Sequence, residues 1–89
     1  MPEFSLQIVN EKGLHARASA KLAELVETFD AEATVSKDGI DAPADSIMGL
    51  LMLAASKGTS IEVQTEGAEA DRLADALEAL VADKFGEGA

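Results

Sequence analysis

Residues 32–43 read Glu-Ala-Thr-Val-Ser-Lys-Asp-Gly-Ile-Asp-Ala-Pro, and this stretch decides the fold class. Asp38-Gly39 at its centre is a strong hairpin signal, because a type I′ turn needs positive φ at both central residues. We therefore expect a strand at residues 32–37 and a short returning strand at 40–43. A β-hairpin in the middle of the chain argues against an all-helical protein.

Two more segments alternate apolar and polar residues with the period of two that indicates a half-buried strand. They span residues 3–9 and residues 60–65. Their inward positions are Phe4, Leu6, Ile8, Ile61 and Val63. The sequence thus predicts four strands.

Three segments favour helices. Residues 16–29 and residues 73–85 carry apolar residues at helical spacing, and the second stripe ends at Phe85. Residues 46–54 are too uniformly apolar for a surface strand, and Ser46 supplies a helix cap.

The predicted order is β-α-β-β-α-β-α in one domain that spans residues 1–89. This order favours an α+β, two-layer open-faced sandwich, with a four-stranded antiparallel sheet and three helices on one face. Gly86 and Gly88 predict a frayed tail after the last helix.

Composition limits the possible functions. The chain has 17 acidic and 7 basic residues and a net charge of −10, so we expect no binding to nucleic acid or membranes. This charge suits a basic partner surface, although solubility alone explains most of it. There is no cysteine and a single histidine, so no metal or cofactor is expected. Neither a leader nor an 18-residue apolar run is seen, which favours the cytoplasm.

Residues 13–19 read Gly-Leu-His-Ala-Arg-Ala-Ser and place His15 where the first strand hands over to a helix. The first N–H groups of that helix, on Ala16, Arg17 and Ala18, point toward the imidazole. An anion there would meet these donors, the positive helix end and a guanidinium. The pattern predicts a phosphate or carboxylate site around a nucleophile, with an ordinary capping or surface histidine as the alternative.

The same stretch resembles the active-site signature of HPr, the histidine phosphocarrier family of the phosphoenolpyruvate-dependent phosphotransferase system. Residues 46–53 resemble the second signature of that family, in the same order and spacing. The resemblance implies that His15 accepts a phosphoryl group on Nδ1 from Enzyme I. It implies that Arg17 neutralises this group before it passes to a IIA-type protein, so the chain is a stoichiometric carrier and not an enzyme.

Ala18 departs from many sugar-branch relatives, which have proline at this position. The alanine form and the acidic, alanine-rich body look more like the nitrogen-related branch of the family. The likeness therefore implies a regulatory, nitrogen-branch IIA protein as the acceptor.

Ser46 aligns with the serine that HPr kinase/phosphorylase modifies in some bacteria, so the resemblance adds a regulatory site to its capping role. It also implies a docking surface beside His15, formed by part of two helices. The predicted docking residues are Ala16, Arg17, Ala20, Lys21, Ile47, Met48, Leu51 and Met52.

Three other functions fit parts of the sequence. A ligand-binding regulatory α+β domain without phosphoryl transfer stays open as the alternative. An acyl carrier would explain Asp45-Ser46-Ile47, but acyl carriers are all helical. A hydrolase is disfavoured because Ser19 would lie a turn inside the helix.

Overall fold

The computed structural model describes residues 2–88, so the two ends of the predicted domain, residues 1 and 89, lie outside the described residues. Its elements follow the predicted order, with a short 3₁₀ turn at the end. They are β1 Glu3–Gln7, α1 Ala16–Glu27, β2 Glu32–Lys37, β3 Ile40–Pro43, α2 Ile47–Met52, β4 Ser60–Glu66, α3 Ala70–Ala82 and the 3₁₀ turn Lys84–Gly86.

The four strands form one sheet in the order β1-β4-β2-β3, with every neighbouring pair antiparallel. The predicted hairpin joins β2 to β3, and its central residues Asp38 and Gly39 have φ of 52° and 80°. Positive φ at both positions is the type I′ pattern, so this prediction is confirmed.

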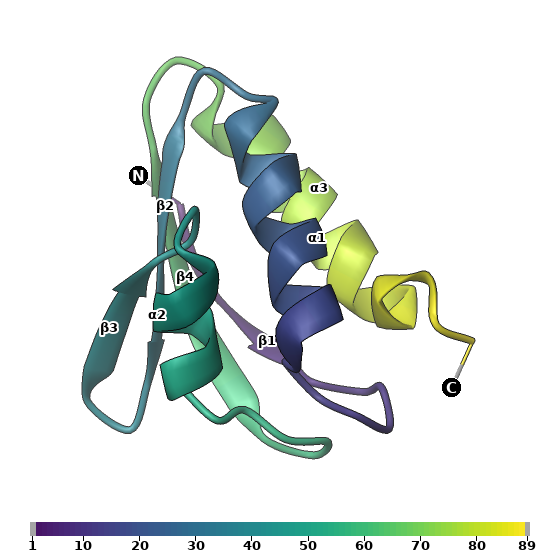
Figure 1. Cartoon of the computed structure of the whole chain (residues 1–89). Helices are drawn as coiled ribbons and strands as arrows, with labels where there is room; N and C mark the ends of the chain where they lie inside the picture. Colours follow the sequence, from purple (N-terminus) through teal and green to yellow (C-terminus); the bar gives the residue numbers. More distant parts are fainter. Residues whose placement is uncertain (1, 89) are drawn as a thin grey trace.

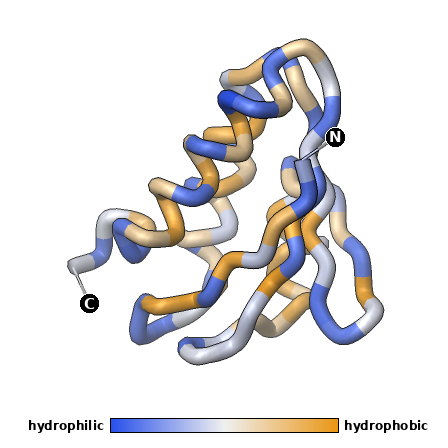
Figure 2. Tube along the Cα trace, turned by 180° about the vertical axis from the view of Figure 1, so that it is seen from behind, coloured by the Kyte–Doolittle hydropathy of each residue, from blue (hydrophilic) through white to orange (hydrophobic). Residues whose placement is uncertain are grey.

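Helices cover one face of this sheet, and α3 runs alongside α1 (Figure 1). Along the strands hydrophobic and hydrophilic residues follow one another (Figure 2), because successive side chains point to opposite faces. The inward set is buried under the helices and comprises Leu6, Ala33, Val35, Ala42, Ile61, Val63 and Thr65. The predicted two-layer α+β architecture is confirmed.

Three predicted elements end earlier than expected, besides the last helix. The helix predicted over 46–54 spans Ile47–Met52, with Ser46 and Leu53 as its caps. The first strand stops at Gln7, not at residue 9, although Ile8 is fully buried and its N–H donates to Thr59 O at 2.8 Å. The helix predicted over 16–29 ends at Glu27, and Phe29 lies in the following loop. Apolar spacing continues into flanking residues that pack on the same core, so it overestimates element length.

The last helix differs most from the prediction. α3 ends at Ala82, because Lys84 and Phe85 adopt left-handed φ values of 56° and 54°. Phe85 is fully buried, as its place in the apolar stripe predicted, but it does not belong to the helix. It belongs to residues 84–87, called the 84–87 turn below, which fold back beside the first part of α1 (Figure 1). The predicted fraying at Gly86 is therefore wrong, because its N–H and the Phe85 ring both have partners in the fold.

Candidate functional site

His15 is the N-cap residue of α1. Its backbone is extended, and its Nδ1 accepts a hydrogen bond from Arg17 N–H at 3.3 Å. The regular helical bonding begins with Ser19 N–H, which donates to His15 O at 2.8 Å. Ala16 and Ala18 N–H therefore belong to the first-turn donors that have no acceptor inside the helix. The predicted set of backbone donors thus lies at the start of α1, and one of them is directed at Nδ1.

The loop before His15 is pinned to the segment that follows α2. Gly13 has φ of +64°, and a Cβ added there would lie 2.4 Å from Ala55 O. Leu14 N–H donates to the same carbonyl at 2.8 Å, and Asn10 Nδ2 donates to Gly13 O at 2.9 Å. Only glycine fits this left-handed, closely packed position without displacing backbone. The loop geometry therefore sets where His15 projects.

The imidazole of His15 faces an open cleft of about 710 Å³. Three cations, Lys12, Arg17 and Lys21, line it and outnumber its two carboxylates, Glu11 and Glu87, which contact Lys57 and His15. Among residues 2–88 none of the three cations forms an ion pair with a carboxylate. In a chain with a net charge of −10, this is a local concentration of positive charge. Together with the positive end of α1, it favours an anion next to the imidazole.

Glu87 is a site residue that the sequence did not indicate. Its Oε2 contacts Nε2 of His15, and its Oε1 accepts from Asn10 Nδ2 at 2.9 Å. The hydrogen bond from Asn10, followed by that from His15, lowers the pKa of the Glu87 carboxyl below its ordinary value. The carboxylate is therefore ionised at neutral pH. No local pattern could have revealed it, since 72 residues separate it from His15.

Ser46 caps α2, as its predicted structural role requires. Its Oγ accepts a hydrogen bond from Gly49 N–H at 3.0 Å. Ser19 is buried inside the first turn of α1 and donates to Leu14 O at 3.2 Å, so its hydroxyl is turned away from solvent. This geometry leaves Ser19 unavailable as a nucleophile.

The predicted docking residues of α2 are exposed, as expected, and are called the apolar patch below. Their exposed fractions are 43% for Ile47, 69% for Met48, 36% for Leu51 and 71% for Met52. α2 packs against α1, so the patch adjoins the helix that His15 caps. On α1 the predicted docking residues differ in exposure: Ala16 and Arg17 are exposed, whereas Ala20 and Lys21 are half-buried.

Comparison with known proteins identifies the family. The family model described as "PTS HPr component phosphorylation site" matches residues 2–83. The chain belongs to the HPr family. It is 47% identical over 81 residues to the phosphocarrier protein HPr of Cupriavidus necator, with 91% of each chain covered.

The relatives include proteins named NPr as well as proteins named HPr. The chain is 46% identical over 85 residues to the phosphocarrier protein NPr of Shewanella violacea, covering 96% of this chain and 93% of that protein. A crystal structure of HPr-C-His from Thermoanaerobacter tengcongensis matches with a TM-score of 0.93 and 36% identity over 98% of both chains. The predicted likeness to phosphocarriers, including the nitrogen-related ones, is confirmed.

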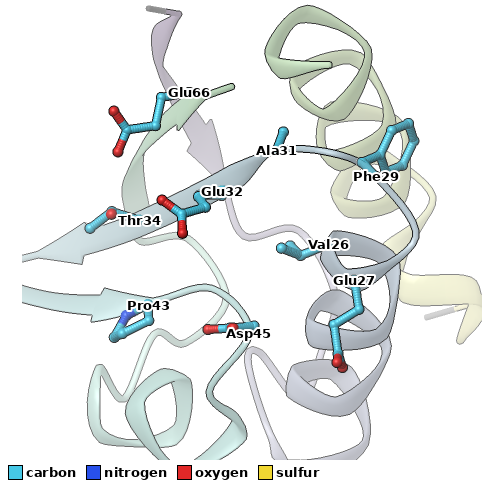
Figure 3. Close-up of a pocket in the computed structure, with 10 residues that line it drawn as sticks. Val26, Glu27, Phe29, Ala31, Glu32, Thr34, Pro43, Asp45 and Glu66 are labelled. Carbon is cyan, nitrogen blue, oxygen red and sulfur yellow. The ribbon is translucent and has the colours of Figure 1, made fainter. Parts of the chain in front are cut away.

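A second cavity, of about 250 Å³, lies toward the other end of α1 (Figure 3). Four carboxylates, those of Glu27, Glu32, Asp45 and Glu66, surround it. This charge would repel a phosphoryl group, so the cleft at His15 is the candidate site of an HPr-family protein. Within residues 2–88 no helix is long and apolar enough to cross a membrane, and no acidic or histidine cluster has metal-binding geometry.

Proposed function

We propose that His15 carries a phosphoryl group on Nδ1 and that the chain works as a stoichiometric phosphocarrier. The observation that supports this most is the position of Nδ1 at the start of α1, where Arg17 N–H donates to it. A group bonded to Nδ1 meets the first-turn donors and the cations of the cleft. Transfer of a phosphoryl group between two nitrogen atoms depends mainly on such alignment and charge neutralisation.

The site would hold the phosphoryl group without trapping it. A helix N-terminus stabilises an anion by about 0.3–1 kcal/mol, and by up to about 2 kcal/mol when it is partly buried. Arg17 is exposed, so its guanidinium can turn toward the group during transfer and away afterwards. We propose Arg17, with the N–H groups of Ala16 and Ala18, as the residues that neutralise the phosphoryl oxygens.

We propose Enzyme I as the donor and a IIA-type protein of the nitrogen branch as the acceptor, with both exchanges in the cytoplasm. The apolar patch on α2, with Ala16, Arg17, Ala20 and Lys21 of α1, would form the docking surface for both partners. Its flexible methionines, Met48 and Met52, suit a surface that binds two different proteins. The NPr relatives support the regulatory acceptor.

Ser46 is proposed as a regulatory phosphorylation site for HPr kinase/phosphorylase. A phosphate there would add about −1.5 to −2 charges beside the apolar patch. We expect Ser46→Asp to weaken Enzyme I binding severalfold, whereas Ser46→Asn, which keeps a capping oxygen without the charge, should not. Calorimetric titration of each variant with Enzyme I measures this, and equal affinities would refute the electrostatic role.

The carrier function is tested by intact mass after incubation with phosphoenolpyruvate and Enzyme I. Wild type should gain one phosphoryl group that brief acid treatment removes, as expected for phosphohistidine. His15→Ala should gain none while its amide spectrum shows an unchanged fold. A charged His15→Ala protein, or an uncharged wild type beside an active Enzyme I, would overturn the proposal and favour a ligand-binding domain.

A further inference from the structure

Glu87, which contacts His15, lies outside residues 2–83, the part of the chain that the family model matches. It is built by the 84–87 turn, which returns to the start of α1 after α3 has ended. The side chains of Glu87 and His15 are 15% and 28% exposed, respectively, so the contact is half-buried at the wall of the cleft.

The fold holds the 84–87 turn at several points. The Phe85 ring is fully buried in the core, and Lys21 Nζ donates to Phe85 O at 2.6 Å. Gly86 N–H donates to Asp83 O at 2.9 Å. The backbone of Lys84 and Phe85 is left-handed, a conformation that is strained for residues other than glycine and persists only where the surroundings enforce it.

Asn10 fixes the Glu87 side chain from the opposite side. Its amide is fully buried, and both of its Nδ2 contacts, Gly13 O and Glu87 Oε1, are acceptors. The amide must therefore point its N–H groups at these atoms. This one side chain joins the loop that positions His15 to the carboxylate that contacts its ring.

The two contacts of the imidazole select its tautomer. An ionised carboxylate only accepts hydrogen bonds, so Nε2 of His15 must carry the proton that is shared with Glu87. Arg17 N–H donates to Nδ1, which requires a lone pair on that nitrogen. Both contacts therefore leave Nδ1 as the nucleophilic atom and hold the ring with Nδ1 toward the helix start.

We propose that Glu87 is a positioning residue for phosphoryl transfer at His15, an inference that rests on the proposed carrier function. In the step, the Nδ1 lone pair forms the new nitrogen–phosphorus bond while the bond from phosphorus to the Enzyme I donor atom breaks. The electron pair of that broken bond stays with the donor. Nε2 keeps its proton throughout, and the Glu87 carboxylate faces the positive charge that develops on the ring.

The test compares Glu87→Ala and Glu87→Gln with Glu78→Gln, which removes the same charge from an exposed position on α3. Rapid-quench charging by phosphorylated Enzyme I is measured at several concentrations of the carrier. Nitrogen-15 NMR of the free proteins reports the tautomer of His15 and the exchange of its Nε2 proton. Amide spectra check that each variant is folded.

We expect Glu87→Ala to lower the maximal charging rate about tenfold, with little change in the half-saturating concentration. Its Nε2 proton should exchange faster with water. Glu87→Gln keeps an acceptor for that proton, so it should recover part of the rate. Glu78→Gln should behave as wild type.

Wild-type charging kinetics in a folded Glu87→Ala variant would overturn this role, and so would a wild-type ring protonated at Nδ1. A variant that is less stable but charges normally would show a purely structural contact and would also overturn it. If Enzyme I fails to charge the wild type, the proposed function fails first. That outcome is distinct, because it appears before any Glu87 variant is compared.

Discussion

At the scale of single residues, the site depends on a glycine as much as on its histidine. Gly13 lets the chain turn with φ of +64° while Ala55 O lies where a Cβ would stand. The turn then presents His15 as the cap of α1. The sequence predicted that His15 lies where the first strand hands over to a helix. The contact with Ala55 was not predictable, because it joins residues about 40 positions apart whose proximity depends on the packed sheet.

Gly13→Ala should destabilise the fold more than the same change at Gly39. Both glycines have positive φ, but the space around Gly39 is open within 4 Å. Left-handed alanine costs about 1–2 kcal/mol at either position. Displacement of backbone at Gly13 adds about 1–3 kcal/mol.

Urea unfolding of the two variants measures this difference. Gly39→Ala serves as the matched control, because it carries the backbone cost without the close contact. Equal unfolding free energies for the two variants would show that the backbone around Gly13 can move to accommodate a Cβ without loss of stability.

At the scale of elements, α2 divides its residues between two roles. It has only six residues, too few to be stable alone in water, so the Ser46 cap and tertiary burial must hold it. Leu50 is fully buried, whereas Met48 is 69% exposed. Sequence reading recognised the cap and the exposed patch, but uniform hydrophobicity could not say which residue enters the core.

Leu50→Ala and Met48→Ala should separate these roles. Removing the buried Leu50 side chain should cost about 2–5 kcal/mol of unfolding free energy. Met48→Ala should change stability by at most about 0.5 kcal/mol. If the apolar patch is the docking surface, Met48→Ala should weaken Enzyme I binding about fivefold or more.

Urea unfolding and calorimetric titration with Enzyme I measure the two effects. Ile40→Ala is the control for binding, because Ile40 is 52% exposed but belongs to β3 and not to the patch. Equal losses of affinity for Met48→Ala and Ile40→Ala would contradict a docking role for α2.

At the scale of the whole molecule, the two ends of the fold meet at one imidazole. The first loop, the start of α1 and the 84–87 turn each contribute a side chain to the group Asn10, His15 and Glu87. This arrangement couples the charge state of the site to the folding of the chain. The coupling has a defined sign, since the pKa of Glu87 is lowered in the folded state.

Glu87→Gln should reduce the loss of stability in acid. A lowered pKa means that the unfolded chain binds the proton more readily, so this contribution to stability is present above pH 4.5, the ordinary value. It is lost as the pH falls from there through the lowered pKa. Unfolding free energies measured by urea from pH 7 downward should therefore decline less steeply for Glu87→Gln than for wild type.

Glu78→Gln is again the control, and its unfolding free energy should decline with falling pH as steeply as that of wild type. Glu11 also has a lowered pKa, through its hydrogen bond and charge interaction with Lys57, but this contribution is common to all three proteins. If the unfolding free energies of wild type and Glu87→Gln fell equally steeply with pH, the contact between Glu87 and His15 would add nothing to the pH dependence of stability.

The sequence by itself determined the element order, the Asp38-Gly39 hairpin, the cap at Ser46 and the position of His15 at a helix start. These features depend on local backbone preferences and on periodicity, which are set by residues close in the sequence and do not require the tertiary structure. Only the tertiary structure decided that α3 stops before Phe85 and that Glu87 reaches His15. Burial of the Phe85 ring enforces a left-handed backbone that no local preference favours, and contacts between distant segments arise only when the core is packed.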